Sequence, residues 1–438
     1  MPSTDHSDLH RLGAQEAAQR IRQGTLSPVA LVDACLARIQ RLDGTLHAWA
    51  HLDEADARAA AEERAAEARR GTIRGPLHGV PVGIKDIYDV AGMPTTGGAR
   101  PWAHTRPARD ATAVAHVRAA GGILLGKTVT TEFAYRDPAP TRNPWNPGHT
   151  PGGSSAGSAA AVSARMVPLA LGSQTVGSVL RPAAYCGVVG IKPTHGAIPV
   201  EGVIPLAWSL DHVGVFGRSV ADAALILGVL LSRELAPAPP SAPRLALAPE
   251  LLVRAEPSVA VQIQAAADRF ARAGASVTEV KLPASFETIL AAGLAVLEAE
   301  AATYHEESFR TYGAEYGKEM AALIEAGRRL SAPAYVRANR ARLRFRDDVT
   351  PLLQTYQALL APTAPSPAPA GLGSTGDGSA CAPWSSAGTP ALTLPSGLSA
   401  DGLPHALQLI AAPGREAALL DVAQWCEAQL GFAAAPSL

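Results

Sequence analysis

Two glycine-rich loops that carry serines lie close together in the sequence, at residues 151–158 (PGGSSAGS) and 172–187 (GSQTVGSVLRPAAYCG). Because glycine has no Cβ, the backbone N–H groups of such loops can turn toward a bound oxyanion. A serine hydroxyl beside these donors supplies two parts of acyl transfer, a nucleophile and a place where negative charge can develop. The third part is a base, for which the best candidate is Lys85 in the stretch 79–86 (GVPVGIKD).

Lys85 can act as a base only when it is neutral, whereas an ordinary lysine has a pKa near 10.4. To be half neutral at pH 8, its pKa must fall by about 2.4, which corresponds to about 3.3 kcal/mol. Burial can supply this change because desolvation disfavours the charged form, and residues 80–84 are largely apolar. The alternative is a structural ion pair of Lys85 with Asp86 or another acid.

Several ordered motifs of the chain resemble those of the amidase signature family, over about residues 8–430. The resemblance implies that Ser178 is the acyl nucleophile, that Ser154 is the bridging serine and that Lys85 is the base. In this family the bridging serine follows a cis peptide bond, here Gly153–Ser154. The matching segments are 79–86, 126–134 (GKTVTTEFA), 151–157, 172–187, 190–194 (GIKPT), 209–214 (SLDHVG) and 396–409 (SGLSADGLPHALQL).

The resemblance also assigns an oxyanion hole to the backbone N–H groups of Thr175, Val176 and Gly177. Most members have aspartate where this chain has Gln174, and glycine where it has Val176. Glutamine keeps the hydrogen-bonding capacity of aspartate without its charge, so we expect Gln174 to support this loop. We expect Ser155 to support the first serine loop in the same way.

Arg181 follows Ser178 by three residues, whereas the common family pattern has an arginine two residues after the nucleophile. The local pattern is similar to the malonamidase-like branch of the family. If Ser178 opens a short helix, Arg181 lies on about the same helix face. Its guanidinium is then a candidate for binding a substrate carboxylate. A structural salt bridge is the alternative.

The elements that position these residues read as a mixture of helices and strands. The first seventy residues carry helix signals, among them Ser27-Pro28 as a helix start. Strand-like and helical segments alternate from residue 80 onward, interrupted at 236–243 (APAPPSAP) by a proline-rich connector. The expected segments are strands at 80–90, 123–125, 244–248 and 276–282, helices at 156–164, 259–273 and 287–355, and a strand–loop–strand–helix ending at 391–430.

Together with the resemblance, this pattern predicts an α/β fold with a large mixed β-sheet core covered by helices on both sides. We expect one domain spanning residues 1–438. Its parts are an N-terminal helical portion at about 1–70, the catalytic motifs at 79–218, and a region at about 244–430 that completes the fold and walls the substrate pocket.

Composition narrows the class of protein. Of 438 residues, 47% are hydrophobic and 18% charged, with a net charge of −1, so no basic excess favours nucleic acid. No apolar run approaches the length of a membrane span. The four cysteines are widely spaced, which argues against a metal cluster or a disulfide framework and favours the cytoplasm. We expect a small-molecule substrate and a homodimer. We expect no metal, no cofactor and no membrane or nucleic-acid partner.

The predicted function is hydrolysis of a small amide, or of a carbamate or ester, through an acyl-enzyme on Ser178. The alternative is the glutaminase (A) subunit of a tRNA-dependent amidotransferase. Residues 121–128 (GGILLGKT) also fit the P-loop expression. Their interior reads as a buried strand and the following residues start a helix poorly, so nucleotide binding is not predicted.

Overall fold

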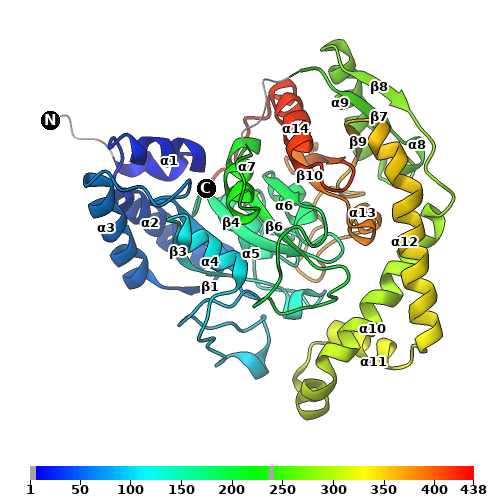
Figure 1. Ribbon diagram of the computed structural model, residues 1–438, viewed down its shortest axis with the longest axis horizontal. Helices are drawn as coiled ribbons and strands as arrows, with labels where there is room; N and C mark the ends of the chain where they lie inside the picture. Colours follow the sequence, from blue (N-terminus) through cyan, green and yellow to red (C-terminus); the bar gives the residue numbers. More distant parts are fainter. Residues whose placement is uncertain (1–5, 236–240) are drawn as a thin grey trace.

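The computed structural model describes residues 6–235 and 241–438, which build one mixed β-sheet flanked by helices (Figure 1). The sheet has eleven strands in the order β1-β3-β2-β4-β6-β5-β10-β11-β9-β7-β8. The predicted α/β fold with a mixed sheet is therefore confirmed. The strands are β1 (Trp49–Leu52), β2 (Pro81–Lys85), β3 (Ile123–Thr128), β4 (Leu169–Gln174), β5 (Val189–Lys192), β6 (His212–Gly217), β7 (Arg244–Leu247), β8 (Ser276–Glu279), β9 (Ala358–Pro362), β10 (Ala391–Leu398) and β11 (Pro404–Ile410).

Helices cover both faces of this sheet (Figure 1). The α-helices are α1 (Ala14–Arg22), α2 (Pro28–Leu46), α3 (Glu54–Arg69), α4 (Thr112–Ala119), α5 (Ala156–Ser163), α6 (Leu180–Cys186), α7 (Val220–Leu230), α8 (Pro249–Leu252), α9 (Pro257–Arg272), α10 (Phe286–Tyr312), α11 (Lys318–Arg328), α12 (Ala332–Thr355), α13 (Ala382–Ala387) and α14 (Glu416–Leu430). Short 3₁₀ turns lie at His6–Arg11, Arg100–Trp102, Glu132–Ala134 and Gly313–Glu315.

The strands serve two hydrophobic cores because successive side chains of a strand point to opposite faces of the sheet. In β4, Leu169 and Leu171 join the core that contains α4, α7, α9 and α14. Ala170 between them joins the core that contains α2, α5, α6 and α13. Both faces are thus apolar, and β2, β3 and β4 are buried along their whole length.

Strand register places the two predicted serine loops beside Lys85. Strand β2 pairs in parallel with both β3 and β4, so their carboxyl ends lie at the same edge. Lys85 is the last residue of β2, and the second serine loop (172–187) begins in the last three residues of β4, which ends at Gln174. Strand β6 runs antiparallel to β4, with His212 opposite Gln174.

Two segments differ from the sequence expectation in the type or number of their elements, and the strand expected at 80–90 ends earlier, at Lys85. The helical stretch at 287–355 is three helices, α10, α11 and α12, which form an arm at one edge of the molecule (Figure 1). The helical N-terminal portion contains the four-residue strand β1, which pairs antiparallel with β3. So short a strand depends on its tertiary partner, and the helices on either side obscure it in the sequence.

Residues 236–240 of the predicted connector lie outside the described residues. None of the described helices combines the length and apolar character that crossing a bilayer requires.

Candidate active site

Lys85 is completely buried at the end of β2, and within the described ranges its Nζ donates hydrogen bonds to two hydroxyl groups. The acceptors are Ser154 Oγ at 2.7 Å and Ser173 Oγ at 2.8 Å. Burial holds the pKa of Lys85 well below its ordinary value, and the charge of Asp211 opposes this shift. Lys85 thus has the environment that a lysine base requires.

Asp86 does not pair with Lys85. It forms an ion pair with Lys127 on the neighbouring strand β3, with Lys127 Nζ 2.9 Å from the carboxylate. Lys127 also donates to the carbonyl of Pro94 at 2.8 Å and to Thr95 Oγ1 at 3.0 Å. Lys127 is the lysine of the P-loop-like expression, and here it belongs to a buried strand, as the sequence indicates. The alternative pairing of Lys85 with Asp86 is therefore wrong.

The first serine loop contains the expected cis peptide bond, Gly153–Ser154. Ser154 is buried, and its carbonyl accepts a hydrogen bond from the N–H of Thr131 at 3.2 Å. The next residue, Ser155, braces the loop against β4, because its Oγ accepts from the N–H of Ser173 at 3.2 Å and donates to the carbonyl of Ser173 at 3.3 Å. Helix α5 begins directly afterwards.

The second serine loop is held by the side chain of Gln174. Its Oε1 accepts hydrogen bonds from the N–H groups of Val179 and Leu180, both at 2.9 Å, at the start of α6. Its Nε2 donates to Ser385 Oγ at 3.0 Å, and Ser385 Oγ donates to the carbonyl of Val176 at 2.7 Å. Gln174 and Ser385 therefore hold the backbone on either side of Ser178, at residues 176 and 179–180, through neutral groups.

The N–H groups of Thr175, Val176 and Gly177 are available as donors. Within residues 6–235 and 241–438, none of them takes part in a hydrogen bond to a backbone carbonyl. Ser178 follows them, is 7% exposed, and lies next to the first loop, since its carbonyl accepts from the N–H of Ser155 at 3.3 Å. The geometry places Ser178, these backbone donors and the buried lysine in neighbouring segments.

Arg181 is buried in α6, and its guanidinium is largely engaged by the protein itself. One Nη donates to the carbonyl of Gly376 at 2.8 Å. The other donates to the carbonyl of Gly153 at 2.7 Å and to Thr375 Oγ1 at 3.1 Å. Only its Nε lacks a partner among the described residues. Arg181 thus joins the peptide before Ser154 to the loop at 375–376, and each of these acceptors is a neutral oxygen.

Two polar residues of this site were not singled out by the sequence argument. Ser173 accepts from Lys85, and Asp211 carries the charge that acts on it. Ser173 precedes Gln174 in the second loop, and Asp211 lies in the 209–214 motif, so both fall in matched segments. Their side-chain types alone do not separate them from other polar residues there.

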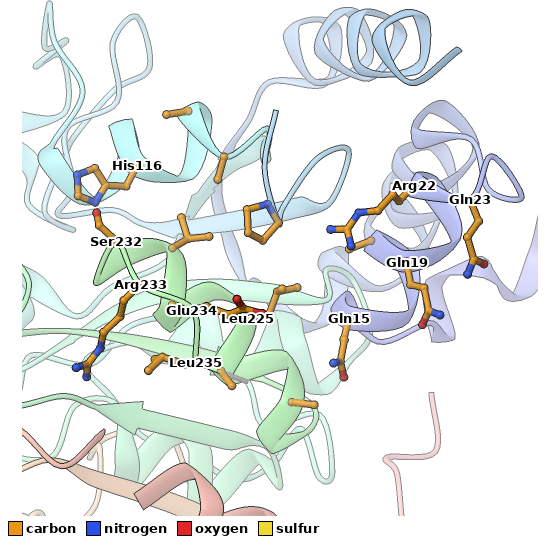
Figure 2. Close-up of a pocket in the computed structure, with 18 residues that line it drawn as sticks. Gln15, Gln19, Arg22, Gln23, His116, Leu225, Ser232, Arg233, Glu234 and Leu235 are labelled. Carbon is orange, nitrogen blue, oxygen red and sulfur yellow. The ribbon is translucent and has the colours of Figure 1, made fainter. Parts of the chain in front are cut away.

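A cavity of about 960 Å³ lies elsewhere, between α1, α4 and α7 (Figure 2). Its walls include Gln15, Gln19 and Arg22 from α1 and His116 from α4. It contains none of the residues of the serine loops. In the described part of the chain, no group of three or more His, Cys, Asp or Glu side chains is arranged to hold a metal ion.

The chain superimposes on a crystal structure of an amidase with a TM-score of 0.90 at 32% sequence identity, covering 96% of this chain and 100% of that one. Its class is accordingly a hydrolase that acts on amide C–N bonds. The chain matches the Amidase family over residues 30–420 and belongs to this family.

Two curated relatives are similar over most of their length. A glutamyl-tRNA(Gln) amidotransferase subunit from Anaeromyxobacter dehalogenans (strain 2CP-C) is 37% identical, and the match covers 99% of each chain. An amidase from Pseudomonas putida is also 37% identical, over 83% of this chain and 81% of the relative. The family is therefore established by both sequence and fold, while the two relatives differ in their activities.

Proposed function

We propose that this chain hydrolyses a small amide through an acyl-enzyme on Ser178, with Ser154 and Lys85 as the proton relay. The observation that carries the proposal is the hydrogen bond of 2.7 Å from the buried Lys85 Nζ to Ser154 Oγ. Burial lowers the pKa of Lys85 well below its ordinary value, which favours the neutral amine that can accept a proton.

In the proposed acylation step, Ser178 Oγ attacks the amide carbonyl while its proton passes to Ser154 and the proton of Ser154 passes to Lys85. The oxyanion is stabilised by the N–H groups of Thr175, Val176 and Gly177. The C–N bond then breaks as the relay returns a proton to the leaving nitrogen. Water attacks the acyl ester through the same relay and regenerates the Ser178 hydroxyl.

The same relay serves esters and carbamates, because the acyl chemistry is common and the pocket selects the substrate. We assign Gln174 and Ser155 to support of the two loops, on the basis of their hydrogen bonds to backbone groups. The contacts of Arg181 favour a positioning role for this residue, and its part in binding a substrate carboxylate stays a prediction.

The experiment is turnover of neutral amides, acidic amides, carbamates and esters by the purified chain, with Ser178→Ala as the test variant. Ser27→Ala is the matched control, because Ser27 is exposed and its side chain makes no capping hydrogen bond. We expect Ser178→Ala to lose at least about 10³-fold in kcat. A fluorophosphonate should label Ser178, and labelling at another residue contradicts the nucleophile assignment.

The second candidate is a glutaminase subunit, favoured by the match to an amidotransferase component over 99% of both chains. It predicts ammonia release from glutamine and little turnover of the other amides by the purified chain. Broad amide hydrolysis without any partner would exclude it. Light scattering on the same sample tests the expected homodimer.

A further inference from the structure

Asp211 belongs to the matched segment 209–214, and the proposed relay leaves it without a role. The register of β4 and β6 places it at residues 175–177, whose N–H groups are the proposed oxyanion donors and which are called the oxyanion loop below. Gln174 lies opposite His212 in this antiparallel pair. Continuing the register by one residue brings Asp211 opposite Thr175, the first residue of the loop. The two residues meet across the sheet edge where the strands end.

The carboxylate of Asp211 accepts three hydrogen bonds that fix its orientation. Oδ1 accepts from Thr175 Oγ1 at 2.5 Å. Oδ2 accepts from the N–H groups of Leu206 at 2.9 Å and Ala207 at 3.0 Å. The Asp211 N–H in turn donates to the carbonyl of Ala207 at 2.8 Å. Asp211 is thus held rigidly by its own loop and in turn holds Thr175.

Asp211 also acts on the base through its charge. It is the acid that favours the charged form of Lys85, against burial. At Tyr88 its charge adds to burial in raising the pKa, so it favours the neutral hydroxyl, which donates to the carbonyl of Gly172 at 2.6 Å. Burial raises the pKa of Asp211 to about 6, and the charge of Glu300 on α10 adds to this shift. Arg342 lies near this group and donates to the carbonyl of Ser209 at 3.2 Å.

We propose that Asp211 is a positioning residue for acyl transfer, which holds the oxyanion loop through the Thr175 hydroxyl and supplies the negative charge that supports protonated Lys85. The inference rests on the proposed function. Lys85 must gain a proton when Ser178 is acylated, and a fixed anion stabilises the ammonium that forms. The two roles are separable, because Thr175 carries the first and the carboxylate charge carries the second.

The test compares Asp211→Asn, Thr175→Val and Thr175→Ser by kcat, KM and the pH profile of kcat/KM. Asparagine can keep the hydrogen bonds to its neighbours while removing the charge. Because the charge of Asp211 favours protonated Lys85, its removal should move the acidic limb to lower pH, by at least about 0.5 pH unit, and lower kcat about tenfold. Asp401→Asn, in an exposed turn, is the control for loss of one charge.

Thr175→Val should lower kcat about tenfold at constant KM with the acidic limb unmoved, and Thr175→Ser should restore most of it. A merely structural role would change stability without moving the pH profile. Unchanged kcat and an unmoved acidic limb in a folded Asp211→Asn protein overturn the inference. If Asp211→Asn does not fold, the threonine pair decides: wild-type kinetics of Thr175→Val overturn the inference, and a loss that serine rescues supports it.

The labelling rate of Ser178 by a fluorophosphonate, followed across pH, separates this inference from the proposed function. If the wild-type chain is not labelled at Ser178 and hydrolyses no amide, the proposed function fails and the inference fails with it. If the wild type is labelled and active while Asp211→Asn and Thr175→Val behave like it, only the role of Asp211 is refuted.

Discussion

Arg181 has two alternative roles that one variant can distinguish: it binds a substrate carboxylate, or it holds the loops of the site together. In Arg181→Met, the buried carbonyl of Gly153 loses its guanidinium donor at 2.7 Å, and Thr375 Oγ1 and the partly buried carbonyl of Gly376 lose theirs. A buried polar group left without a partner costs about 1–3 kcal/mol. Because water can reach the carbonyl of Gly376, only the Gly153 carbonyl and Thr375 Oγ1 are left buried without a partner. Their combined cost in unfolding free energy is about 2–6 kcal/mol. Relief from burying the guanidinium charge offsets part of this cost.

We therefore expect Arg181→Met to lower the free energy of unfolding by about 2–3 kcal/mol, the lower end of this range. Because Gly153 precedes Ser154, the same change should lower kcat on neutral and acidic amides alike. The assays are urea unfolding and steady-state kinetics on one neutral and one acidic amide of equal size. Arg136→Met is the matched control, because Arg136 is exposed and its guanidinium lies over the ring of Tyr135.

The opposite pattern would refute this reasoning. If Arg181→Met raises KM at least tenfold for the acidic amide while stability and kinetics on the neutral amide stay at wild-type values, Arg181 binds the substrate carboxylate.

Three further predictions concern buried polar groups. Asp86→Asn leaves Lys127 without its counterion and should lower the free energy of unfolding by about 3–5 kcal/mol, measured by urea unfolding. The double variant Asp86→Asn/Lys127→Met should recover most of this loss. If the stability of the single variant is unchanged, the pairing is contradicted. Burial raises the pKa of Glu427 to about 7, so the folded state favours the neutral carboxyl group. The stability that this group contributes is lost as the pH rises through 7. Glu427→Gln should thus gain up to about 3 kcal/mol at pH 8.5 and little at pH 4, and equal gains at both pH values would exclude this cause. Gln174→Ala leaves the two N–H groups at the start of α6 without their acceptor and should cost about 2–4 kcal/mol and lower kcat at constant KM, whereas an altered KM alone would speak against a supporting role.

The serine loops and the burial of Lys85 could be predicted because their signals are local. Glycines and serines in a fixed order imply a loop with inward N–H groups whatever the rest of the chain does. Lys85 stood out as a lysine after an apolar segment, and burial is what lowers its pKa. The Gly153–Ser154 cis bond followed from the family resemblance, not from any property of those two residues.

The partners of the charged groups could not be predicted because they depend on register and on distant segments. Asp86 follows Lys85 in sequence, yet its partner Lys127 comes from the neighbouring strand, where Lys127 lies opposite Ile84. Arg181 finds Thr375 in a loop nearly two hundred positions away, at a sequence separation of 194. Asp211 reaches Thr175 only through the antiparallel pairing of β4 and β6. The spacing of these residues in the sequence carries no information about these side-chain contacts.

The partners of three buried cations explain why only one of them is suited to be a base. Burial lowers the pKa of Lys127 too, but the carboxylate of Asp86 opposes this shift and favours the charged form. Arg181 donates to two backbone carbonyls, acceptors that match a permanently charged guanidinium. Among the described residues, the hydrogen-bond partners of Lys85 Nζ are two hydroxyls, which can donate as well as accept, so these hydrogen bonds survive the loss of its proton. A neutral Lys85 is therefore tolerated, whereas a neutral Lys127 would leave the buried charge of Asp86 without its counterion. The proposed proton relay can thus run from Lys85 through Ser154 alone.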